Sequence, residues 1–347
     1  MKRLARIPGL KIWTLLLLLT GSISACDILE EEPEDCAVYV RFKYDMNMNF
    51  ADAFSSSVNS VTLYAFDKDG VLAYQKTEEG DILKQDGYRM RLDGISRTEK
   101  GEYDFITWAG DADRNESFVI PMMTVGQSTK EDLIYQLRRA GDGVVDKDIK
   151  DLFHGQAENV QIGRAAAEIP GYEVVVPLMK NTNSIRIVLQ HLSGKPVDVD
   201  KLHFSITDRN GTMNYDNMLL DDEVLTYKAW HKAQGSAGIG EEQEGVITEV
   251  NLALADLTIC RLMAEYEPGQ EPWLVVTNDQ MEQVIRLPLV DYALLYKRLR
   301  YEDMSDQEFL DREDEYNMTF FLDENYKWIN QFIYINSWKV VLQNSEL

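Results

Sequence analysis

Short stretches in which apolar and polar side chains alternate recur along most of the chain, and they limit the possible folds more than any other feature. In Ala37–Tyr44, Val38, Val40 and Phe42 occupy every second position, which is the pattern of a half-buried strand. Asp67-Lys68-Asp69-Gly70 separates two such stretches, and Asp-Gly is a hairpin signal because glycine takes positive φ without steric cost. The pattern predicts strands at 37–44, 58–66, 71–75, 88–92, 103–108, 174–178, 184–192, 201–207, 246–254, 259–265, 273–277, 284–287, 316–322 and 332–342.

The strands fall into two successive series, which together predict a mainly β fold: two tandem β-sandwiches with a few short helices. The polar stretch Asn181-Thr182-Asn183 separates the two series. We therefore expect an N-terminal β-sandwich over 37–180 and a C-terminal β-sandwich over 181–347. Pro177 cannot donate to a ladder, so it favours an edge position for the strand at 174–178. Repeated β-α-β units are not part of the pattern.

The sequence predicts helices in only a few places. Leu133, Ile134 and Leu137 share one face of a helix expected over Thr129–Ala140, which has acidic residues in its first turn and arginines in its last. A second, short helix is expected over 290–299. The sequence Ser305-Asp306-Gln307-Glu308 has the spacing of a capping box and predicts one more helical turn.

Two further local predictions concern the second series. Gln234–Gly245 is rich in glycine and glutamate and is typical of a mobile loop. The last strand, at 332–342, is expected to be continuous. Its residues on one face are Phe332, Tyr334, Asn336, Trp338, Val340 and Leu342.

Residues 1–25 have the pattern of an export signal. Basic residues precede a short apolar run over Ile12–Thr20, and small residues follow it. The run is much shorter than the roughly 20 residues that a membrane-spanning helix needs. Ile23-Ser24-Ala25-Cys26 matches the bacterial lipobox, so Cys26 is the predicted lipid attachment site and the first residue of the mature chain. The alternative is an ordinary secreted protein in which Cys26 pairs elsewhere or stays free.

Charge and cysteine content limit the partners. The formal net charge is −24, and such a surface repels nucleic acid. Residues 26–36 form an acidic tether ahead of the first strand.

Cys36 and Cys260 could form a disulfide in an export compartment. Because they lie far apart in sequence, two buried free thiols are the favoured state.

A search for catalytic and cofactor motifs gives no candidate. None of the four histidines, His154, His191, His203 and His231, has the spacing of a metal site. Structural hydrogen bonds are the favoured roles for the first three. We predict that the chain is not an enzyme and needs no cofactor. Trp230 and Trp328 lie beside loops, and they are the two candidates for a sugar-stacking surface.

Several motifs, in order along nearly the whole mature chain, resemble the FimB-like fimbrial anchor lipoproteins of the order Bacteroidales. The C-terminal motif combines Asn317-Met318-Thr319-Phe320 with Ile335-Asn336 and Trp338, and Leu152-Phe153-His154-Gly155 matches in the middle. The other matching segments are Asp35-Cys36, Asn47-Met48, 51–54, 61–70 and 261–263.

This resemblance implies two transthyretin-like β-sandwich domains in a minor fimbrial subunit. Such a subunit is a lipoprotein, acylated with palmitate-type chains, that attaches a surface fimbria (pilus) to the outer membrane and limits its assembly. Cys26 is the only functional residue that the resemblance supplies, as the lipid site. The acidic residues after it resemble the signal that directs lipoproteins of the Bacteroidota to the outer face of the outer membrane. The expected location is therefore the cell surface.

Stalk subunits of such fimbriae lose a leader after a basic residue, but no lysine or arginine lies between Cys26 and Arg41. We therefore expect this chain to keep its lipid. The expected partner is a fimbrial stalk subunit, which pairs by strand donation with an exposed sheet edge. Two alternatives remain: a surface glycan-binding lipoprotein with Trp230 and Trp328 exposed on one face, and a free-standing adhesin or inhibitor without an open edge.

Overall fold

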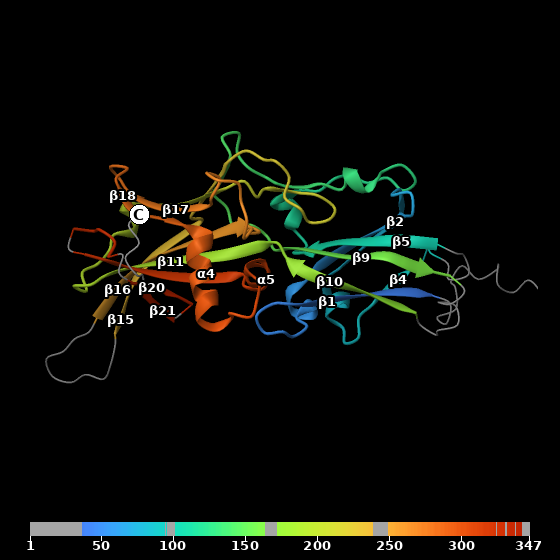
Figure 1. Ribbon diagram of the computed structural model, residues 1–347, viewed down its shortest axis with the longest axis horizontal. Helices are drawn as coiled ribbons and strands as arrows, with labels where there is room; N and C mark the ends of the chain where they lie inside the picture. The colour runs from blue at the N-terminus through green and yellow to red at the C-terminus, as the bar shows by residue number, and fades with distance from the viewer. Residues whose placement is uncertain are drawn as a thin grey trace, which may run out of the picture.

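The computed structural model describes residues 37–93, 95, 101–163, 172–238, 249–323, 325–329, 332–336 and 338–341. In this part of the chain the fold is mainly β, with two sandwiches in tandem along the long axis (Figure 1), as the alternating pattern predicts. Its α-helices are short: α2 (Phe54–Ser57), α4 (Leu289–Arg300) and α5 (Asp306–Arg312).

A seven-stranded sheet in the order β3-β2-β5-β9-β10-β1-β4 forms the first sandwich by folding over itself. Apolar side chains from both halves of the sheet meet in one core, among them Val40 of β1 and Leu63 of β2. The strands are β1 (Val38–Met46), β2 (Ser60–Asp67), β3 (Leu72–Glu79), β4 (Met90–Leu92), β5 (Gly101–Gly110), β9 (Leu152–Ile162) and β10 (Glu173–Lys180).

The second sandwich packs a six-stranded sheet, β15-β16-β11-β19-β20-β21, against a five-stranded sheet, β18-β17-β12-β14-β8. The strands of the first are β11 (Thr182–His191), β15 (His231–Gly238), β16 (Glu249–Cys260), β19 (Glu315–Leu322), β20 (Phe332–Ile335) and β21 (Trp338–Val341). Those of the second are β8 (Val144–Val145), β12 (Leu202–Asp208), β14 (Leu225–Lys228), β17 (Trp273–Asn278) and β18 (Gln283–Pro288).

The segment between β5 and β9 connects the two halves. Its strand β8 pairs in parallel with β14. A small three-stranded sheet joins β6 (Phe118–Val119) and β7 (Tyr135–Leu137) to β13 (Thr212–Met213) of the second half. The apolar core of the second sandwich is therefore continuous with the outer face of β2 and β5, where Tyr64 and Trp108 are buried.

Between the sandwiches, the chain passes almost straight from β10 into β11. Asn181 alone separates these strands, and its backbone N–H donates to the Leu152 carbonyl at 2.7 Å. The polar stretch at 181–183 is therefore the joint between two strands that run nearly end to end (Figure 1).

The helix expected over Thr129–Ala140 does not form. A single turn of 3-10 helix, η4 (Lys130–Asp132), follows Thr129, and the chain then extends into β7. Leu133, Tyr135 and Leu137 are all buried, whereas Ile134 is 37% exposed. A period of two therefore overrides the helical period, because Tyr135 stacks on Trp108 with ring centroids 4.2 Å apart.

Four predictions about strands and loops also need correction. The two strands expected at 246–254 and 259–265 are a single strand, β16, which continues to Cys260. β10 is an interior strand, and Pro177 lies opposite Lys43 where the register with β1 begins to shift, a bulge that tolerates the missing donor. The stretch at 332–342 is not continuous, because Asn336 (φ +47°) turns β20 back into β21. Gln234–Gly238, placed in a loop by its glycines, belongs to β15.

The turn and capping predictions are confirmed. Gly70 has φ +76°, and its N–H donates to the Asp67 carbonyl in the β2–β3 hairpin. The Ser305 hydroxyl accepts from the Glu308 N–H at the start of α5, and α4 covers the helix expected at 290–299. The strands expected at 273–277 and 284–287 pair with each other as the β17–β18 hairpin.

Candidate functional site

The two ends of the molecule differ: the described chain begins at one end, and a hairpin of two strands projects at the other. β10 leads into the second sandwich, so its first residue, Glu173, lies at the end of the first sandwich farthest from the joint. β1 runs parallel to β10, with Tyr39 opposite Glu173 and Met46 opposite Met179. The described chain therefore begins at the outer end of the first sandwich, and Cys26 and Cys36, both outside the described residues, precede this point.

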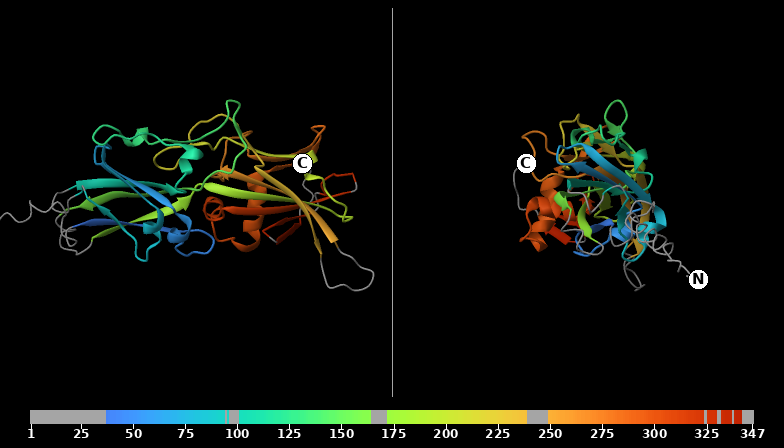
Figure 2. Two further views of the ribbon diagram at one scale, coloured as in Figure 1. Left: turned by 180° about the vertical axis from the view of Figure 1, so that it is seen from behind. Right: turned by 90° about the vertical axis from the view of Figure 1, so that its right-hand side faces the viewer.

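At the opposite end, a hairpin of β15 and β16 extends beyond the rest of its sheet. The register of β16 with β11 stops at Leu252 opposite Gln190, whereas its register with β15 continues to Glu249 opposite Gly238. We call this end the hairpin pole. Figure 2 shows the two strands projecting at the end of the molecule opposite β1 and β4.

Charged side chains bridge the two edges of the first sheet. Lys76 on β3 donates from Nζ to the Arg91 carbonyl on β4 at 2.9 Å, and it also pairs with Glu78 and Asp93. The Tyr88 hydroxyl donates to Glu78 at 2.7 Å. A strand from another protein would have to displace these contacts to pair with either edge.

The edges of the second sandwich differ in length. β8 has two residues, β21 has four, and β18 has six and ends in Pro288. β15 has eight residues and pairs with β16 alone among the described strands. A fully paired neighbour for it would be about 26 Å long at the usual rise per residue.

The beginning of β15 is held by polar contacts. His231 Nδ1 lies 2.8 Å from Asp256, and Lys232 Nζ donates to the carbonyls of Val199 and Leu202 on the facing layer. Beyond Lys232 the strand reads Ala-Gln-Gly-Ser-Ala-Gly, without charge or bulk, and Gln234 to Ser236 are exposed. The open part of this edge is therefore Ala233–Gly238, beyond the residues that are held by polar contacts.

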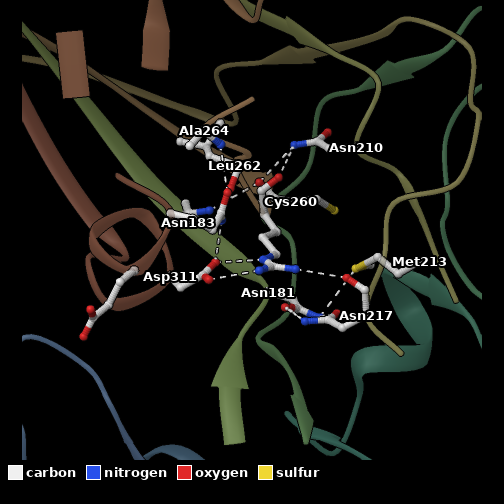
Figure 3. A network of polar contacts seen from close by, with 12 residues as sticks. Asn181, Asn183, Asn210, Met213, Asn217, Cys260, Leu262, Ala264 and Asp311 are labelled. Carbon is white, nitrogen blue, oxygen red and sulfur yellow. Dashed lines mark hydrogen bonds and ion pairs between the residues drawn. The ribbon is translucent and has the colours of Figure 1, made fainter. Parts of the chain in front are cut away.

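A buried polar network fixes the joint between the sandwiches (Figure 3). Asn181 Nδ2 donates to Asn217 Oδ1 at 2.6 Å, and Asn217 Nδ2 donates back to Asn181 Oδ1 at 3.1 Å. Arg261 donates to the Asn217 carbonyl at 3.0 Å and forms a bidentate pair with Asp311. Because its members come from β10–β11, the β13 region, the end of β16 and α5, the network fixes all four segments together.

Charged groups continue this joint towards β1. Lys180 lies between Asp151 (3.0 Å) and Asp314 (2.8 Å). Burial alone would lower the pKa of Lys180, but the two carboxylates outweigh it and raise this pKa. Burial raises the pKa of nearby Glu313 to about 7, and Asp314 adds to the rise. Arg312 donates to the Asp45 carbonyl at the end of β1 and lies over the Phe50 ring.

The histidines have structural contacts. His154 Nε2 lies 2.8 Å from the Tyr215 carbonyl, and burial lowers the pKa of this imidazole to about 4. His191 contacts Ser193, and His203 contacts Asp279. Among the described residues, no group of histidine, cysteine and carboxylate side chains has the arrangement of a metal site. Cys260 is a buried free thiol.

The two candidate tryptophans lie on opposite sides of one sheet. The indole of Trp230 donates to Thr258 on the outer face and is 41% exposed. Trp328 packs edge-on against Phe320, whose side chain is fully buried on the inner face. They cannot form a common stacking surface, so that form of the glycan-binding hypothesis is wrong.

Comparison with known proteins identifies the family of this chain. The family model described as the fimbrillin-A associated anchor proteins Mfa1 and Mfa2 matches residues 32–344. The chain belongs to this family. A relative from Porphyromonas gingivalis, the minor fimbrium anchoring subunit Mfa2, is 20% identical over 227 residues, covering 64% of this chain and 66% of that protein. The chain thus spans slightly less than two thirds of that anchor's length.

Solved structures agree with the fold of the anchor family. A candidate adhesin from Bacteroides thetaiotaomicron is 36% identical with a TM-score of 0.77, over 90% of this chain and 99% of that one. The fimbrial anchor protein Mfa2 of Porphyromonas gingivalis has the same fold, with a TM-score of 0.60 at 18% identity, over 88% and 98% of the two chains.

The open edge of β15 and the joint network were not predicted from the sequence. The glycines at positions 235 and 238 favoured a loop over the β15 segment. The sequence predicted a strand at 246–254, in the region of its partner β16, but not the pairing between the two. Asn181 was expected only as part of a polar break between the two strand series. Its burial and its pairing with Asn217 could not be predicted, because buried asparagines are distinguished from exposed ones only by partners distant in sequence. Among the described residues, no helix is long and apolar enough to cross a membrane.

Proposed function

We propose that the protein is a non-enzymatic anchor that holds a surface fimbria to the outer membrane through acyl chains on Cys26. Membership of the fimbrial anchor family carries this proposal, because the family match covers residues 32–344, which is nearly all of the chain after the lipobox cysteine. Several acyl chains on one cysteine give stable membrane attachment, whereas a single chain binds only marginally.

The tether that precedes the first sandwich supports a permanent lipid. Cys26 is about a dozen residues from β1, a reach of about 40 Å at most. The first basic residue after it is Arg41, inside β1 and opposite Val175 of β10. Cleavage after a basic residue would therefore remove part of an interior strand, so a chain of this design keeps its lipid.

A protein that is anchored at one end must bind its partner at the other, and the two ends of this molecule differ in the way that this requires. The chain begins at the outer end of the first sandwich, and the long open edge lies at the hairpin pole. A free-standing adhesin or inhibitor was expected to lack an open edge, so β15 favours the anchor. In its described residues, the first sandwich keeps β1 and has bridged edges, so this part offers no vacated groove for another subunit. A subunit that cannot be added to this sandwich would limit assembly at the base of the fibre.

A single cysteine substitution tests the anchor. In cells that express Cys26→Ala, we expect the protein and its fibres in the culture medium and few fibres on the cells. Cys36→Ala is the matched control, since Cys36 lies ten positions outside the lipobox, and it should leave both on the cell surface. Fibres that remain attached to Cys26→Ala cells would contradict the proposal.

A further inference from the structure

We propose that β15 is the edge to which the fimbrial stalk subunit adds a strand, through Ala233–Gly238, and that the added segment is extended, uncharged and apolar at alternate positions. This inference rests on the anchor function proposed above and names the partner surface for it.

The backbone of β15 determines the class of partner. An edge strand presents N–H and C=O groups at the strand repeat, and only another extended chain satisfies them in series. Proteins protect long edges with charge, proline or bulges. On β15 the last charged residue among those described is Lys232, and its ammonium is already bound to the Val199 and Leu202 carbonyls.

The outer face beside this edge explains why the partner is apolar. Ala233 lies opposite Leu254, and Gly235 lies opposite Leu252. Both leucines are only partly buried, and the next strand continues the face with Val188 opposite Leu254. A row of aliphatic side chains therefore ends at β15, where the edge residues are too small to cover it.

Large side chains on an added strand would complete this face. Cross-strand neighbours and their diagonal positions are within reach of long apolar side chains. Because Gly235 has no side chain and Ala233 has a methyl group, residues of the incoming strand can reach across them to Leu252 and Leu254. A second copy of β15 that paired through the same segment would bring the equally small Ala233 and Gly235 to this face and leave the leucines uncovered, so the geometry favours a different chain.

The experiment uses the full-length protein and the purified stalk subunit from the same fimbrial operon. Gly235→Lys adds a charge to the edge, and an added Cβ there has no atom within 4 Å, so the fold should tolerate it. We expect at least about tenfold weaker binding of the stalk subunit, since edge charge opposes strand addition. Ala233→Lys should act in the same direction. Gln75→Lys on the edge strand β3, also exposed, is the matched control and should bind like wild type.

The outcomes separate this inference from the anchor function. Unchanged binding by Gly235→Lys and Ala233→Lys, with wild-type binding intact, overturns the β15 assignment but leaves the anchor. No binding by the wild-type protein at all overturns both. Dimers of the wild-type chain that Gly235→Lys dissociates, without any effect on stalk binding, would assign the edge to a second copy instead.

Discussion

Arg261 and Asp311 form a bidentate ion pair at the joint between the sandwiches, with Nε–Oδ1 at 2.8 Å and Nη2–Oδ2 at 2.9 Å. The third donor of the same guanidinium reaches the Asn217 carbonyl. Both side chains are about nine-tenths buried, so the pair connects the end of β16, α5 and the loop beside β13 where water is largely excluded. Removing one partner leaves the other as an unpaired charge.

Arg261→Met should therefore destabilise the protein by about 3 kcal/mol, the usual cost of breaking a buried pair by removing one partner. Urea unfolding followed by far-UV circular dichroism measures this. Lys68→Met is the control, because the Lys68–Asp69 pair is exposed and such pairs contribute little. Equal midpoints for the two variants would show that the joint does not depend on this pair.

The β7 segment offers a test of the corrected secondary structure. Tyr135→Ala should cost about 3–5 kcal/mol, as expected for a buried aromatic side chain, because the Tyr135 ring stacks on Trp108. Ile134→Ala should change stability by no more than about 0.5 kcal/mol. A helix over Thr129–Ala140 would instead make Ile134 part of the apolar face, so a large loss for Ile134→Ala would contradict the strand.

Gly155, in the Leu152-Phe153-His154-Gly155 motif, is expected to be intolerant of a side chain. An added Cβ would overlap the Pro177 carbonyl oxygen on β10, and backbone cannot move aside as a side-chain tip can. We expect Gly155→Ala to destabilise by about 1–3 kcal/mol, the usual range for overpacking. Thermal unfolding provides the measurement. Gly235→Ala is the control, and similar losses in both variants would refute the steric explanation.

Glu313 should make stability depend on pH. Its pKa rises from 4.5 to about 7 in the folded state, so between these values the folded state binds more protons than the unfolded state. The free energy of unfolding therefore falls as pH rises from about 4.5 to 7.

Glu313→Gln should remove this component. Relative to wild type, the variant should gain stability between pH 5 and pH 8 on the order of 2–3 kcal/mol. Urea unfolding at both pH values measures the difference, and Glu302→Gln, on the exposed surface, is the matched control. A constant offset between wild type and Glu313→Gln at the two pH values would rule out this role for Glu313.

Local pattern predicts much of this fold, and the misses have physical causes. Val38, Val40 and Phe42 alternate because one face of β1 meets one core, and such strands are visible in sequence. The acidic residues after Thr129 do begin a helical turn, but only one turn of 3-10 helix forms, since burial of Tyr135 outweighs helix propensity. The edge of β15 is defined by what its neighbours leave uncovered, and the joint asparagines by partners distant in sequence. Neither is a local property.

The parallel pairing of β1 with β10 has a mechanical consequence for a tethered protein. In the anchor proposed above, tension through the N-terminus would draw β1 outward, while a fibre at the hairpin pole would draw β10 and β11 the other way. The two strands then slide past each other lengthwise, and the ladder from Tyr39–Glu173 to Lys43–Pro177 resists in shear, with its hydrogen bonds strained together. An antiparallel neighbour in the same place would unzip one bond at a time, so this strand order suits a chain that is pulled from both ends.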